Sequence, residues 1–505
     1  MIIRNIGHSM KYEAECVAML FFPDEKIVTE EYPAGTVFEP APAGQDYLEN
    51  RLEDGVMQTE LWLNGERSQL RAEIVPCPQT PYEEAEYIMC DQMYTLLCKA
   101  TGSVSAWGML TGVRPVKLFH RRLDAGKSEQ ETGDEFERYF HVSREKIALA
   151  LETARHEAPI LREAQDDTYS LYVSIPFCPS RCSYCSFVSH DIASKRAREI
   201  LPVYVERLCE ELAAIAERMS GTGLKLTTVY FGGGTPTILS AEQLDRVCTA
   251  VETHFDLSAL REYTVEAGRP DTIDREKLRV LRRHGISRIS INPQTLNDEV
   301  LQKIGRRHTA QEIIDCFHMA REEGFDNINM DLIAGLPGDT VEGFCSSIDR
   351  IIELDPENVT VHTLSIKRSA KLGASWEERR KALELARQVG EMVSYAQRRL
   401  MQEGWMPYYL YKQRNTLGNL ENTGYCKPGC EGRYNIYIMD ETQTILAAGG
   451  GAVSKLRSNR TDRLERIFNY KYPFEYVEQF DEVLKRKDRV VTFFEENRPL
   501  PLRKD

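Results

Sequence analysis

Leu171-Tyr-Val-Ser-Ile-Pro-Phe-Cys178-Pro-Ser-Arg-Cys182-Ser-Tyr-Cys185-Ser-Phe187 is the stretch that decides the fold of this chain. An apolar run typical of a strand leads directly into three cysteines with the spacing C-x3-C-x2-C. Three thiolates on one short loop can hold three irons of a 4Fe–4S cluster, which leaves the fourth iron without a protein ligand. An open iron can bind a chelating molecule, so the loop indicates a chemical site and not only an electron relay.

A structural zinc site is the first alternative for the same loop. Structural zinc usually takes four ligands, commonly as two pairs of cysteine or histidine. His190 lies five residues after Cys185 and is the candidate fourth ligand. Unrelated buried thiols are the second alternative, and the spacing alone leaves these explanations open.

Downstream of the loop, β-rich apolar runs alternate with stretches of helical period. The six runs that read as strands are 171–177, 227–231, 262–266, 288–292, 327–333 and 359–364. The stretches that read as helices include 202–219, 241–254, 274–284, 310–323 and 341–354. This alternation predicts a parallel sheet with right-handed crossovers, and six units predict an α/β fold with a partial (βα)6 TIM-like barrel. Ligands of such sheets gather beyond the carboxyl ends of the strands.

The flanking regions predict two further domains, in keeping with a length of 505 residues. We expect an N-terminal α+β domain over 1–165, the barrel over 166–403 and a C-terminal β-rich cap over 404–505. Strands are expected at 16–22 and 69–75, helices at 83–100 and 146–164, and a loop at 124–135. In the cap, 406–412 and 433–439 read as strands, and 443–448 makes a hairpin with the latter plausible.

Composition restricts the class of protein. The net charge of −14 argues against nucleic acid as a partner, because non-specific binding to nucleic acid needs a basic surface. Thirteen cysteines, an odd number in a large chain, disfavour a secreted disulfide framework. The sequence has no apolar run of membrane-spanning length, and its start does not read as a signal peptide. We therefore expect a cytoplasmic protein without a membrane span.

Polar or glycine-rich motifs follow several of the expected strands. Gly232-Gly-Gly-Thr235 lets backbone groups approach a ligand closely, although a tight turn is the simpler explanation. Glu266 and Asp331 are carboxylates in apolar strands and need partners, either in a ligand or in a structural hydrogen bond. Gln294 can donate to and accept from a ribose, and Arg306 can form a bidentate pair with a carboxylate. The alternatives for these two are a turn residue and a solvated arginine.

The cysteine loop resembles the signature of the radical SAM superfamily. The longer string Tyr172-x-x-Ile-Pro-Phe-Cys178-x3-Cys182-x-Tyr-Cys185-x-Phe187 resembles the oxygen-independent coproporphyrinogen III oxidase group, over roughly residues 170–455. Leu110-Thr-Gly-Val-Arg-Pro-Val-Lys117, together with the long N-terminal region, is similar to the HemZ-type branch, called coproporphyrinogen dehydrogenases.

The resemblance implies two cofactors, a 4Fe–4S cluster and S-adenosylmethionine (SAM). It implies the cluster ligands Cys178, Cys182 and Cys185. It implies SAM contacts from Tyr172, Tyr184, Gly233, Gly234, Thr235, Glu266, Gln294, Arg306 and Asp331. In the implied mechanism the reduced cluster cleaves SAM to methionine and a 5′-deoxyadenosyl radical, and the cofactors carry the hard chemistry.

The substrate implied by the resemblance is coproporphyrinogen III, two of whose propionates become vinyl groups. The implied partner is a reducing electron donor such as flavodoxin or ferredoxin. Because the substrate carries four carboxylates, two local basic sets are candidates for binding it. They are Arg114, Lys117, Arg121 and Arg122, and Lys412, Arg414, Lys427 and Arg433.

The chain departs from the authentic coproporphyrinogen enzymes at two positions. Phe187 stands where those enzymes have a further cysteine, and Ser174 stands where they tend to have histidine. Both positions are closer to a related heme-chaperone branch, so a heme carrier is the alternative function, and a tetrapyrrole methyltransferase is a third. Candidate heme or metal ligands are Cys426, Cys430, His8, His308 and His362.

Overall fold

The computed structural model describes residues 1–23, 25–38, 46–75, 84–164, 167–187, 189–365, 376–413, 416–458, 461 and 463–497. The chain divides into two compact units, each assembled from separate segments. Unit 1 comprises Met1–Ala154, Thr363–Tyr395 and Leu410–Asn422, and unit 2 comprises Arg155–His362, Ala396–Tyr409 and Thr423–Asp505. The expected three consecutive domains stay a prediction.

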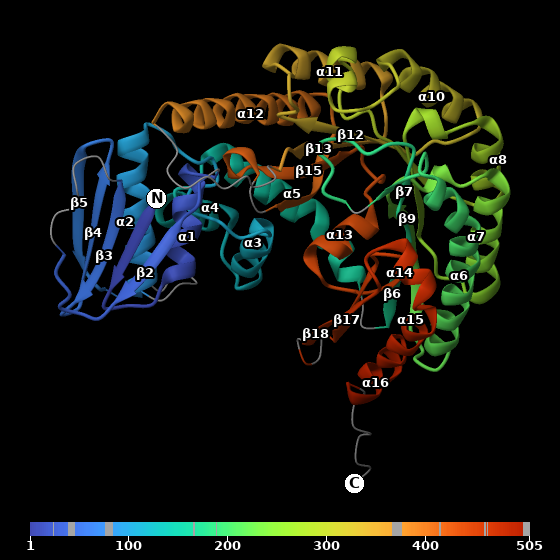
Figure 1. The fold of residues 1–505 in the computed structure, drawn as a ribbon, viewed down its shortest axis with the longest axis horizontal. Coiled ribbons are helices and arrows are strands. Elements are labelled where there is room, and N and C mark those ends of the chain that lie inside the picture. Colours follow the sequence, from blue (N-terminus) through green and yellow to red (C-terminus); the bar gives the residue numbers. More distant parts are fainter. Residues whose placement is uncertain are drawn as a thin grey trace, which may run out of the picture. The chain divides into compact units, whose positions relative to one another are not determined.

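Unit 1 contains a five-stranded sheet with helices packed on it (Figure 1). The sheet has the order β2-β1-β3-β4-β5, with parallel pairing of β1 to both neighbours and antiparallel pairing from β3 to β5. Its strands are β1 (Ile2–Ile6), β2 (Val28–Tyr32), β3 (Tyr47–Glu53), β4 (Val56–Leu63) and β5 (Glu66–Glu73). The helices of this region are α1 (Lys11–Phe21), α2 (Glu84–Thr101), α3 (Pro115–Asp124), α4 (Glu129–Phe140) and α5 (Arg144–Glu163). The α+β expectation is therefore confirmed.

Two expectations for this region are wrong. The apolar run 16–22 belongs to helix α1, whose buried residues Ala14, Val17, Ala18 and Phe21 recur at helical spacing. A short apolar run does not by itself separate strand from helix, and the helical period decided here. Most of the expected loop 124–135 is helix α4, which Ser128 and Glu131 begin with a capping box.

Unit 2 is organised by a large mixed sheet of order β14-β15-β13-β12-β11-β10-β9-β6-β16-β17-β18. The six expected strands form its centre: β6 (Thr168–Ile175), β9 (Lys225–Gly233), β10 (Glu262–Gly268), β11 (Arg288–Ile291), β12 (Ile328–Ala334) and β13 (Asn358–Thr363). Neighbours from β6 to β12 pair in parallel. The remaining strands are β7 (Phe177–Cys178), β8 (His190–Asp191), β14 (Met406–Lys412), β15 (Glu421–Cys426), β16 (Thr444–Ala448), β17 (Val453–Ser458) and β18 (Arg463–Phe468).

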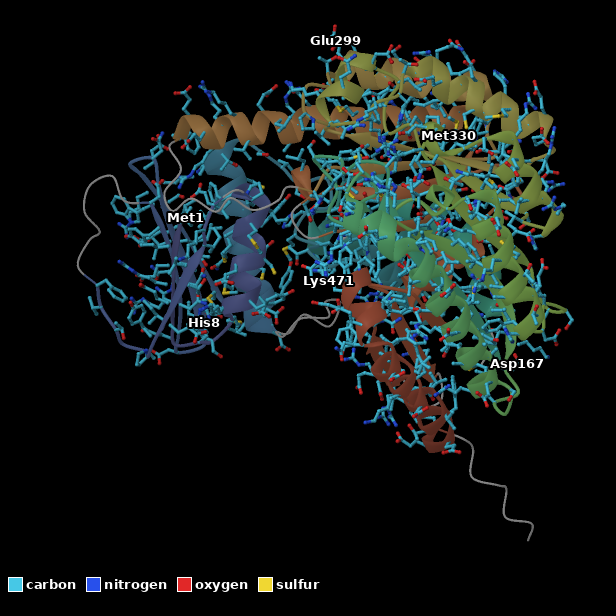
Figure 2. All side chains as sticks on the ribbon, turned by 45° about the vertical axis from the view of Figure 1, so that its right-hand side comes forward. Met1, His8, Asp167, Glu299, Met330 and Lys471 are labelled. Carbon is cyan, nitrogen blue, oxygen red and sulfur yellow. The ribbon has the colours of Figure 1, made fainter. Side chains whose placement is uncertain are left out.

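The α/β expectation is confirmed, and the described strands form an open sheet that does not close into a barrel. At one side β13 pairs antiparallel with β15, and at the other β6 pairs in parallel with β16. Helices α6 (Lys195–Met219), α7 (Ala241–His254) and α8 (Arg275–Arg283) lie side by side on the outer face (Figure 1). Strand β12 is buried on both faces, with Met330 fully covered, whereas Glu299 on the outer helix α9 (Asp298–Lys303) is exposed (Figure 2).

The helices downstream of these complete the described structure. They are α10 (Ala310–Glu322), α11 (Val341–Leu354), α12 (Trp376–Gln402), α13 (Arg433–Asp440), α14 (Pro473–Glu478), α15 (Phe480–Arg486) and α16 (Asp488–Glu496). None of the helices in the described residues is long and apolar enough to cross a membrane.

The expected strand at 433–439 is wrong, because these residues form helix α13. The run is rich in tyrosine and isoleucine, which are common in strands, but Tyr434 and Tyr437, one helical turn apart, are both buried. The expected hairpin is also wrong. Residues 444–448 form β16, which pairs with β6 and with β17 instead.

Candidate cofactor site at the cysteine loop

The cysteine loop begins where β6 ends, at the carboxyl edge of the parallel strands. Cys182 is buried, with 8% of its surface exposed, while Cys178 and Cys185 are half-buried. None of the three takes part in a disulfide. Burial raises the pKa of Cys178, and the neighbouring Cys185 and Cys182 raise it further, which places the three sulfurs in one electrostatic environment.

The loop is held by hydrogen bonds from segments far away in the sequence. The backbone N–H of Ile192 donates to the Cys178 carbonyl over 2.9 Å, and that of Ser183 donates to the Ile304 carbonyl over 3.1 Å. The Arg269 guanidinium donates to Ser180 Oγ over 2.8 Å. The protein fold itself therefore fixes the conformation of the loop.

The glycine-rich turn at the end of β9 packs directly against the start of the cysteine loop. The Thr235 N–H donates to the Phe177 carbonyl over 2.8 Å, and the Thr235 hydroxyl donates to Cys178 Sγ over 3.4 Å. A Cβ at Gly234 would lie 2.5 Å from the Phe177 carbonyl oxygen, so only glycine fits there. Gly233 has φ +111, outside the range of most side-chain-bearing residues.

Arg306 and Tyr184 meet beside the cysteine loop. Arg306 Nη2 donates to the Tyr184 hydroxyl over 3.2 Å, and Nη1 donates to the Asn292 carbonyl over 2.5 Å. Arg306 Nε is buried and has no hydrogen-bond partner in the described structure. Because a buried guanidinium N–H without an acceptor costs free energy, Arg306 is suited to a carboxylate that the protein itself does not supply.

Gln294 takes an unusual backbone conformation next to β12. Its φ is +68, in the left-handed region that glutamine rarely adopts. Its N–H donates to the Asp331 carbonyl over 2.8 Å, and its carbonyl accepts from the Ile333 N–H over 2.9 Å. Backbone strain of this kind is concentrated at functional sites, and here the two hydrogen bonds to β12 hold Gln294 in the strained conformation.

Glu266 lies inside the sheet with a phenol as its partner. The Tyr230 hydroxyl donates to Glu266 Oε1 over 2.7 Å. Burial raises the pKa of Glu266 to about 7, and the nearby Asp331 adds to the rise. Near neutral pH this carboxyl group is therefore poised between its protonated and ionised forms.

Asp331 stays ionised although it lies close to Glu266. Burial would raise the pKa of Asp331, but a hydrogen bond and charge from His362 together with a hydrogen bond from Asn329 lower it. Asn329 Nδ2 donates to Asp331 Oδ1 over 2.7 Å, and His362 Nε2 lies 3.9 Å from Oδ2. His362 is thus a partner of a predicted site residue.

Tyr172 belongs to a stack of three tyrosines in the same interior. Its ring centroid lies 6.1 Å from that of Tyr434 and 6.3 Å from that of Tyr230, and Tyr230 and Tyr434 are 4.4 Å apart. Tyr434 comes from α13 and was missed, because 433–439 was interpreted as a strand. Tyr230 directly precedes Phe231 and the glycines, so its place in the motif was the available signal.

The predicted residues thus form two groups, one at the carboxyl edge of the parallel strands and one in the sheet interior. Those at the cysteine loop are Cys178, Cys182, Cys185, Tyr184, Gly233, Gly234, Thr235 and Arg306. Those in the sheet interior are Tyr172, Glu266 and Asp331, with Gln294 bonded to β12 through its backbone.

These residues fit the two cofactors that the loop suggests. A glycine cradle, three thiols and an arginine N–H without an acceptor match an iron–sulfur cluster with an open iron and an amino acid ligand. Within the described residues, no three His, Cys, Asp or Glu side chains lie close enough to hold one metal ion. His190, the candidate zinc ligand, instead packs its ring against Phe474 at 5.0 Å and Tyr472 at 5.9 Å.

The other candidate ligands lie on β15 and in the turn after it, two residues after Arg306, and in unit 1. Cys426 is fully buried on β15, and Cys430 is half-buried in the following turn. Burial lowers the pKa of His308 to about 4; neither of its ring nitrogens has a hydrogen-bond partner in the described structure, although Nδ1 lies 3.9 Å from Asp271 Oδ1. Burial also lowers the pKa of His8, which lies in unit 1.

Most of the candidate basic residues are engaged within the protein. Arg122 pairs with Glu135 at 2.7 Å, Lys427 pairs with Asp355 at 2.8 Å, and Arg433 pairs with Glu163 at 2.5 Å. The Lys412 ammonium is buried and donates to the Leu110 carbonyl over 2.5 Å. Arg414 lies outside the described residues.

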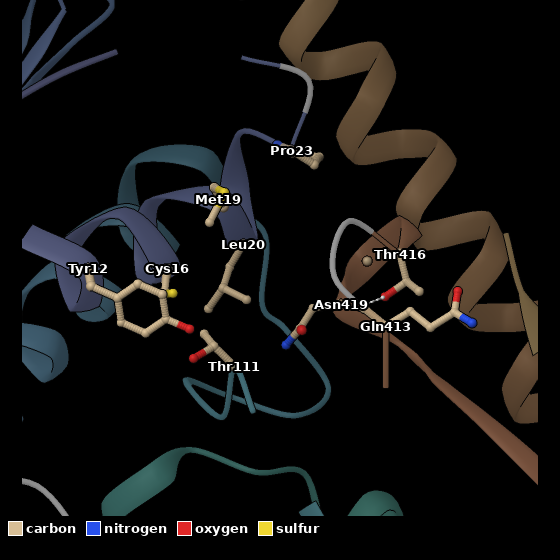
Figure 3. A pocket seen from close by; sticks show the side chains of 10 residues that line it. Tyr12, Cys16, Met19, Leu20, Pro23, Thr111, Gln413, Thr416 and Asn419 are labelled. Carbon is tan, nitrogen blue, oxygen red and sulfur yellow. Dashed lines mark hydrogen bonds between the residues drawn. The ribbon is translucent and has the colours of Figure 1, made fainter. Parts of the chain in front are cut away.

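A small cavity of about 110 Å³ lies in unit 1 (Figure 3). Met19 and Leu20 of α1 line one wall, and Thr416 and Asn419 face them. None of the predicted cofactor residues lines this cavity.

Comparison with known proteins places the site in a family. Residues 172–351 match the model of the radical SAM superfamily. The chain is 42% identical over 396 residues to the oxygen-independent coproporphyrinogen-III oxidase-like protein HemZ of Bacillus subtilis, covering 78% of each chain. It is 32% identical to the heme chaperone HemW of Lactococcus lactis, over 66% of this chain and 81% of that protein.

Among solved structures, coproporphyrinogen III oxidase (HemN) of Escherichia coli aligns with a TM-score of 0.47 at 22% identity, over 65% of this chain and 73% of that one. Members of the radical SAM superfamily use a 4Fe–4S cluster and S-adenosylmethionine. The identity to the Bacillus subtilis relative extends well beyond the cysteine loop. The chain therefore belongs to the oxygen-independent coproporphyrinogen-III oxidase-like group of the radical SAM superfamily.

Proposed function

We propose that this protein catalyses the oxygen-independent oxidative decarboxylation of coproporphyrinogen III to protoporphyrinogen IX. The single observation that supports it most is the construction around Cys178, where the cysteine loop and the glycine-rich turn are hydrogen-bonded into one unit beside Arg306. The Bacillus subtilis relative, which is 42% identical, is named an oxygen-independent coproporphyrinogen-III oxidase-like protein. The substrate itself is inferred from that relationship.

In this proposal Cys178, Cys182 and Cys185 hold the cluster, and the residues around them hold SAM. Arg306 would bind the SAM carboxylate, since its Nε has no acceptor among the described residues. The backbone of Gly233 and Gly234 would bind the amino group. When bound, the cluster and SAM supply a reductive bond cleavage and a carbon radical that abstracts hydrogen.

The protein's own part is to orient the reactants and exclude water. The tyrosine stack of Tyr172, Tyr230 and Tyr434 forms an apolar wall in the sheet interior, and Glu266 and Asp331 lie beside it. Each of the two reacting propionates would lose one hydrogen atom to the carbon radical that bound SAM supplies, and then one carbon dioxide and one electron, the electron passing to an external acceptor, which leaves a vinyl group. A water-free interior protects the substrate radical during this loss.

Phe187 favours a second candidate function, heme binding and transfer to client proteins. Its ring is 36% exposed directly after the cysteine loop, at the position where authentic coproporphyrinogen enzymes have a cysteine. Ser174 is buried and donates to the Gly450 carbonyl over 2.9 Å, so it fills a structural position. The Lactococcus lactis relative is a heme chaperone.

One anaerobic assay separates the two functions. Reconstituted protein is incubated with SAM, reductant and coproporphyrinogen III, and carbon dioxide and protoporphyrinogen are quantified. Turnover supports the decarboxylase. Absence of turnover together with stoichiometric heme uptake supports the carrier, and a methylated tetrapyrrole supports a methyltransferase.

The ligand assignment has its own test. Cys182→Ala is expected to lose the iron–sulfur absorption and SAM cleavage, because a cube with two protein ligands is labile. Cys345→Ala is the matched control, since Cys345 is a half-buried free thiol on α11. An intact cluster spectrum in Cys182→Ala would contradict the assignment.

A further inference from the structure

Exposed basic side chains surround the cysteine loop of this acidic protein. One of them, Arg181, lies inside the loop between the first two cysteines. The others lie at the start of α6 and around the end of α9. We call this set the cationic rim: Arg181, Lys195, Arg196, Arg198, Lys303 and Arg307, all of them exposed.

Backbone hydrogen bonds bring the segments of the cationic rim together. Residues 177–178 pair with 190–191 as strands β7 and β8, directly before α6. The Ser183 N–H donates to the Ile304 carbonyl over 3.1 Å, and Ser180 Oγ donates to the Gly305 carbonyl over 3.2 Å. The basic side chains therefore share one surface with the outer side of the cysteine loop.

The cationic rim is only partly neutralised. Lys195 and Arg196 lie 3.7 Å and 3.9 Å from Glu199 and Glu478. No carboxylate in the described part of the chain lies within ion-pair distance of Arg181, Arg198, Lys303 or Arg307. The net charge of the whole chain is −14, so the rim is a local positive area on a negative molecule.

Aromatic side chains are interspersed with these charges. Phe187 and Tyr472 are 36% and 43% exposed. The Arg196 guanidinium lies 3.9 Å from the ring centroid of Phe474, which in turn contacts His190. Exposed aromatic residues and arginine are enriched where proteins bind one another, whereas a merely solvated surface carries few large rings.

We propose that the cationic rim is the docking surface of an acidic one-electron carrier protein that reduces the cluster. This inference rests on the proposed function, because only a redox-active cluster needs such a partner. The carrier loses one electron and the cluster gains it, and no bond is formed or broken in the transfer. Complementary charge steers the carrier to the loop, where the transfer distance is shortest.

The test compares a rim variant with a matched control. Lys195→Glu/Arg196→Glu reverses two charges in the first turn of α6, where acidic residues suit the helix dipole. Lys225→Glu/Lys485→Glu reverses two exposed charges elsewhere on unit 2. Lys225 begins β9, whose other end carries the glycine motif. Lys485 follows Leu484, whose carbonyl accepts from Arg218, and Arg218 lies roughly 33 Å along α6 from Arg196.

SAM cleavage is measured with three electron sources, namely reduced flavodoxin, reduced ferredoxin and dithionite. For at least one carrier, the rim variant is expected to lose about tenfold or more in rate at low ionic strength, with the control unchanged. Its rate with dithionite is expected to equal that of the wild type. Calorimetric titration of flavodoxin or ferredoxin into cluster-free protein gives a second readout, with the same loss of affinity expected.

Each remaining outcome overturns the docking surface. Unchanged rates and affinities with both carriers would show that the rim does not bind them. An equal loss with dithionite would show that the reversed charges damage the site itself. Failure of the wild type to cleave SAM even with dithionite would instead refute the proposed function, so the two failures are distinguishable.

Discussion

The Thr235 hydroxyl donates a hydrogen bond to Cys178 Sγ over 3.4 Å, although the two residues are 57 positions apart. One residue earlier, the Gly234 N–H donates to the Ile175 carbonyl over 2.8 Å. The end of β9 thus sets the position of Cys178, the first of the three proposed cluster ligands. A substitution in the glycine turn should therefore reduce cluster binding at the proposed site more than it reduces the free energy of unfolding.

Gly234→Ala is expected to lower the iron content of reconstituted protein. The added Cβ would lie 2.5 Å from the Phe177 carbonyl oxygen and 2.9 Å from the Phe177 nitrogen, which are rigid backbone atoms. The strand end must shift, and Cys178 moves with it. Iron and sulfide analysis after anaerobic reconstitution measures the effect.

Gly390→Ala is the control for this substitution. Gly390 lies inside α12, and its added Cβ would meet nothing within 4 Å. Alanine there should raise the free energy of unfolding by about 1 kcal/mol, because glycine is a poor helix former. Iron content equal to wild type is expected, and equal iron loss in both variants would refute the argument.

The strand order could be predicted because each βα unit repeats the same local pattern. The strand at 262–266 and the helix at 241–254 appear where the sequence places them. Helices α1 and α13 could not be predicted in this way. Both contain short apolar runs, which fit a strand as well as a helix, and only the spacing of the side chains that become buried separates the two. Tyr434 illustrates this, since its ring stacks on Tyr230, some two hundred positions earlier.

The site could be predicted in part, since polar residues at the ends of successive parallel strands must share one edge. What the sequence does not show is which of them touch. Arg306 bonds Tyr184 across 122 positions, and Glu266 takes Tyr230 as its partner. Such contacts depend on strand register and side-chain direction, which one sequence without its fold does not specify.

Glu266 should make the stability of the cofactor-free protein depend on pH. Burial raises its pKa from 4.5 to about 7, so the folded state favours the protonated form. The stabilisation is complete below the unfolded pKa and is lost as pH rises through about 7. Ionisation at higher pH costs up to about 3 kcal/mol, from 1.4 kcal/mol per pKa unit.

The measurement is urea unfolding of wild type and Glu266→Gln from pH 4 to pH 8. The variant should gain stability relative to wild type across this range, because glutamine does not ionise. Parallel pH profiles would contradict the raised pKa. Glu242→Gln, at an exposed carboxylate in the first turn of α7, serves as the comparison for a general charge effect.

Arg306→Lys should weaken SAM binding more than it weakens the fold. Lysine keeps the positive charge but loses the planar fork that contacts Tyr184, Asn292 and the proposed carboxylate together. We expect the dissociation constant for SAM to rise about tenfold or more, as for loss of one charge-assisted hydrogen bond. Equilibrium dialysis with reconstituted protein measures it, and Arg307→Lys, at the exposed neighbour, should bind SAM like wild type.

In unit 1, Lys146 and Glu421 form a buried ion pair with side chains that are 1% and 0% exposed. Lys146 Nζ donates to Glu421 Oε1 over 2.6 Å, and Trp107 Nε1 donates to Oε2 over 2.7 Å. Burial would raise the pKa of Glu421, but the Lys146 charge and hydrogen bond lower it, so the carboxylate stays ionised. Lys146→Met leaves that carboxylate without its cation and should cost about 3–5 kcal/mol in the free energy of unfolding.

Adding Glu421→Gln to Lys146→Met removes the stranded charge while keeping an acceptor for Trp107. The double variant should therefore be more stable than Lys146→Met alone, with a coupling free energy of about 1–3 kcal/mol in a double-mutant cycle from urea unfolding.

The single variant Glu421→Gln also affects a second cation, Lys412. Burial lowers the pKa of Lys412 to about 7, and the charge of Glu421 opposes that shift. Glu421→Gln alone should lose more stability below pH 7 than above it. Below pH 7 Lys412 is charged, and the variant lacks the carboxylate that favours this charge. Strict additivity of the two substitutions at every pH would show that the pair contributes no mutual stabilisation.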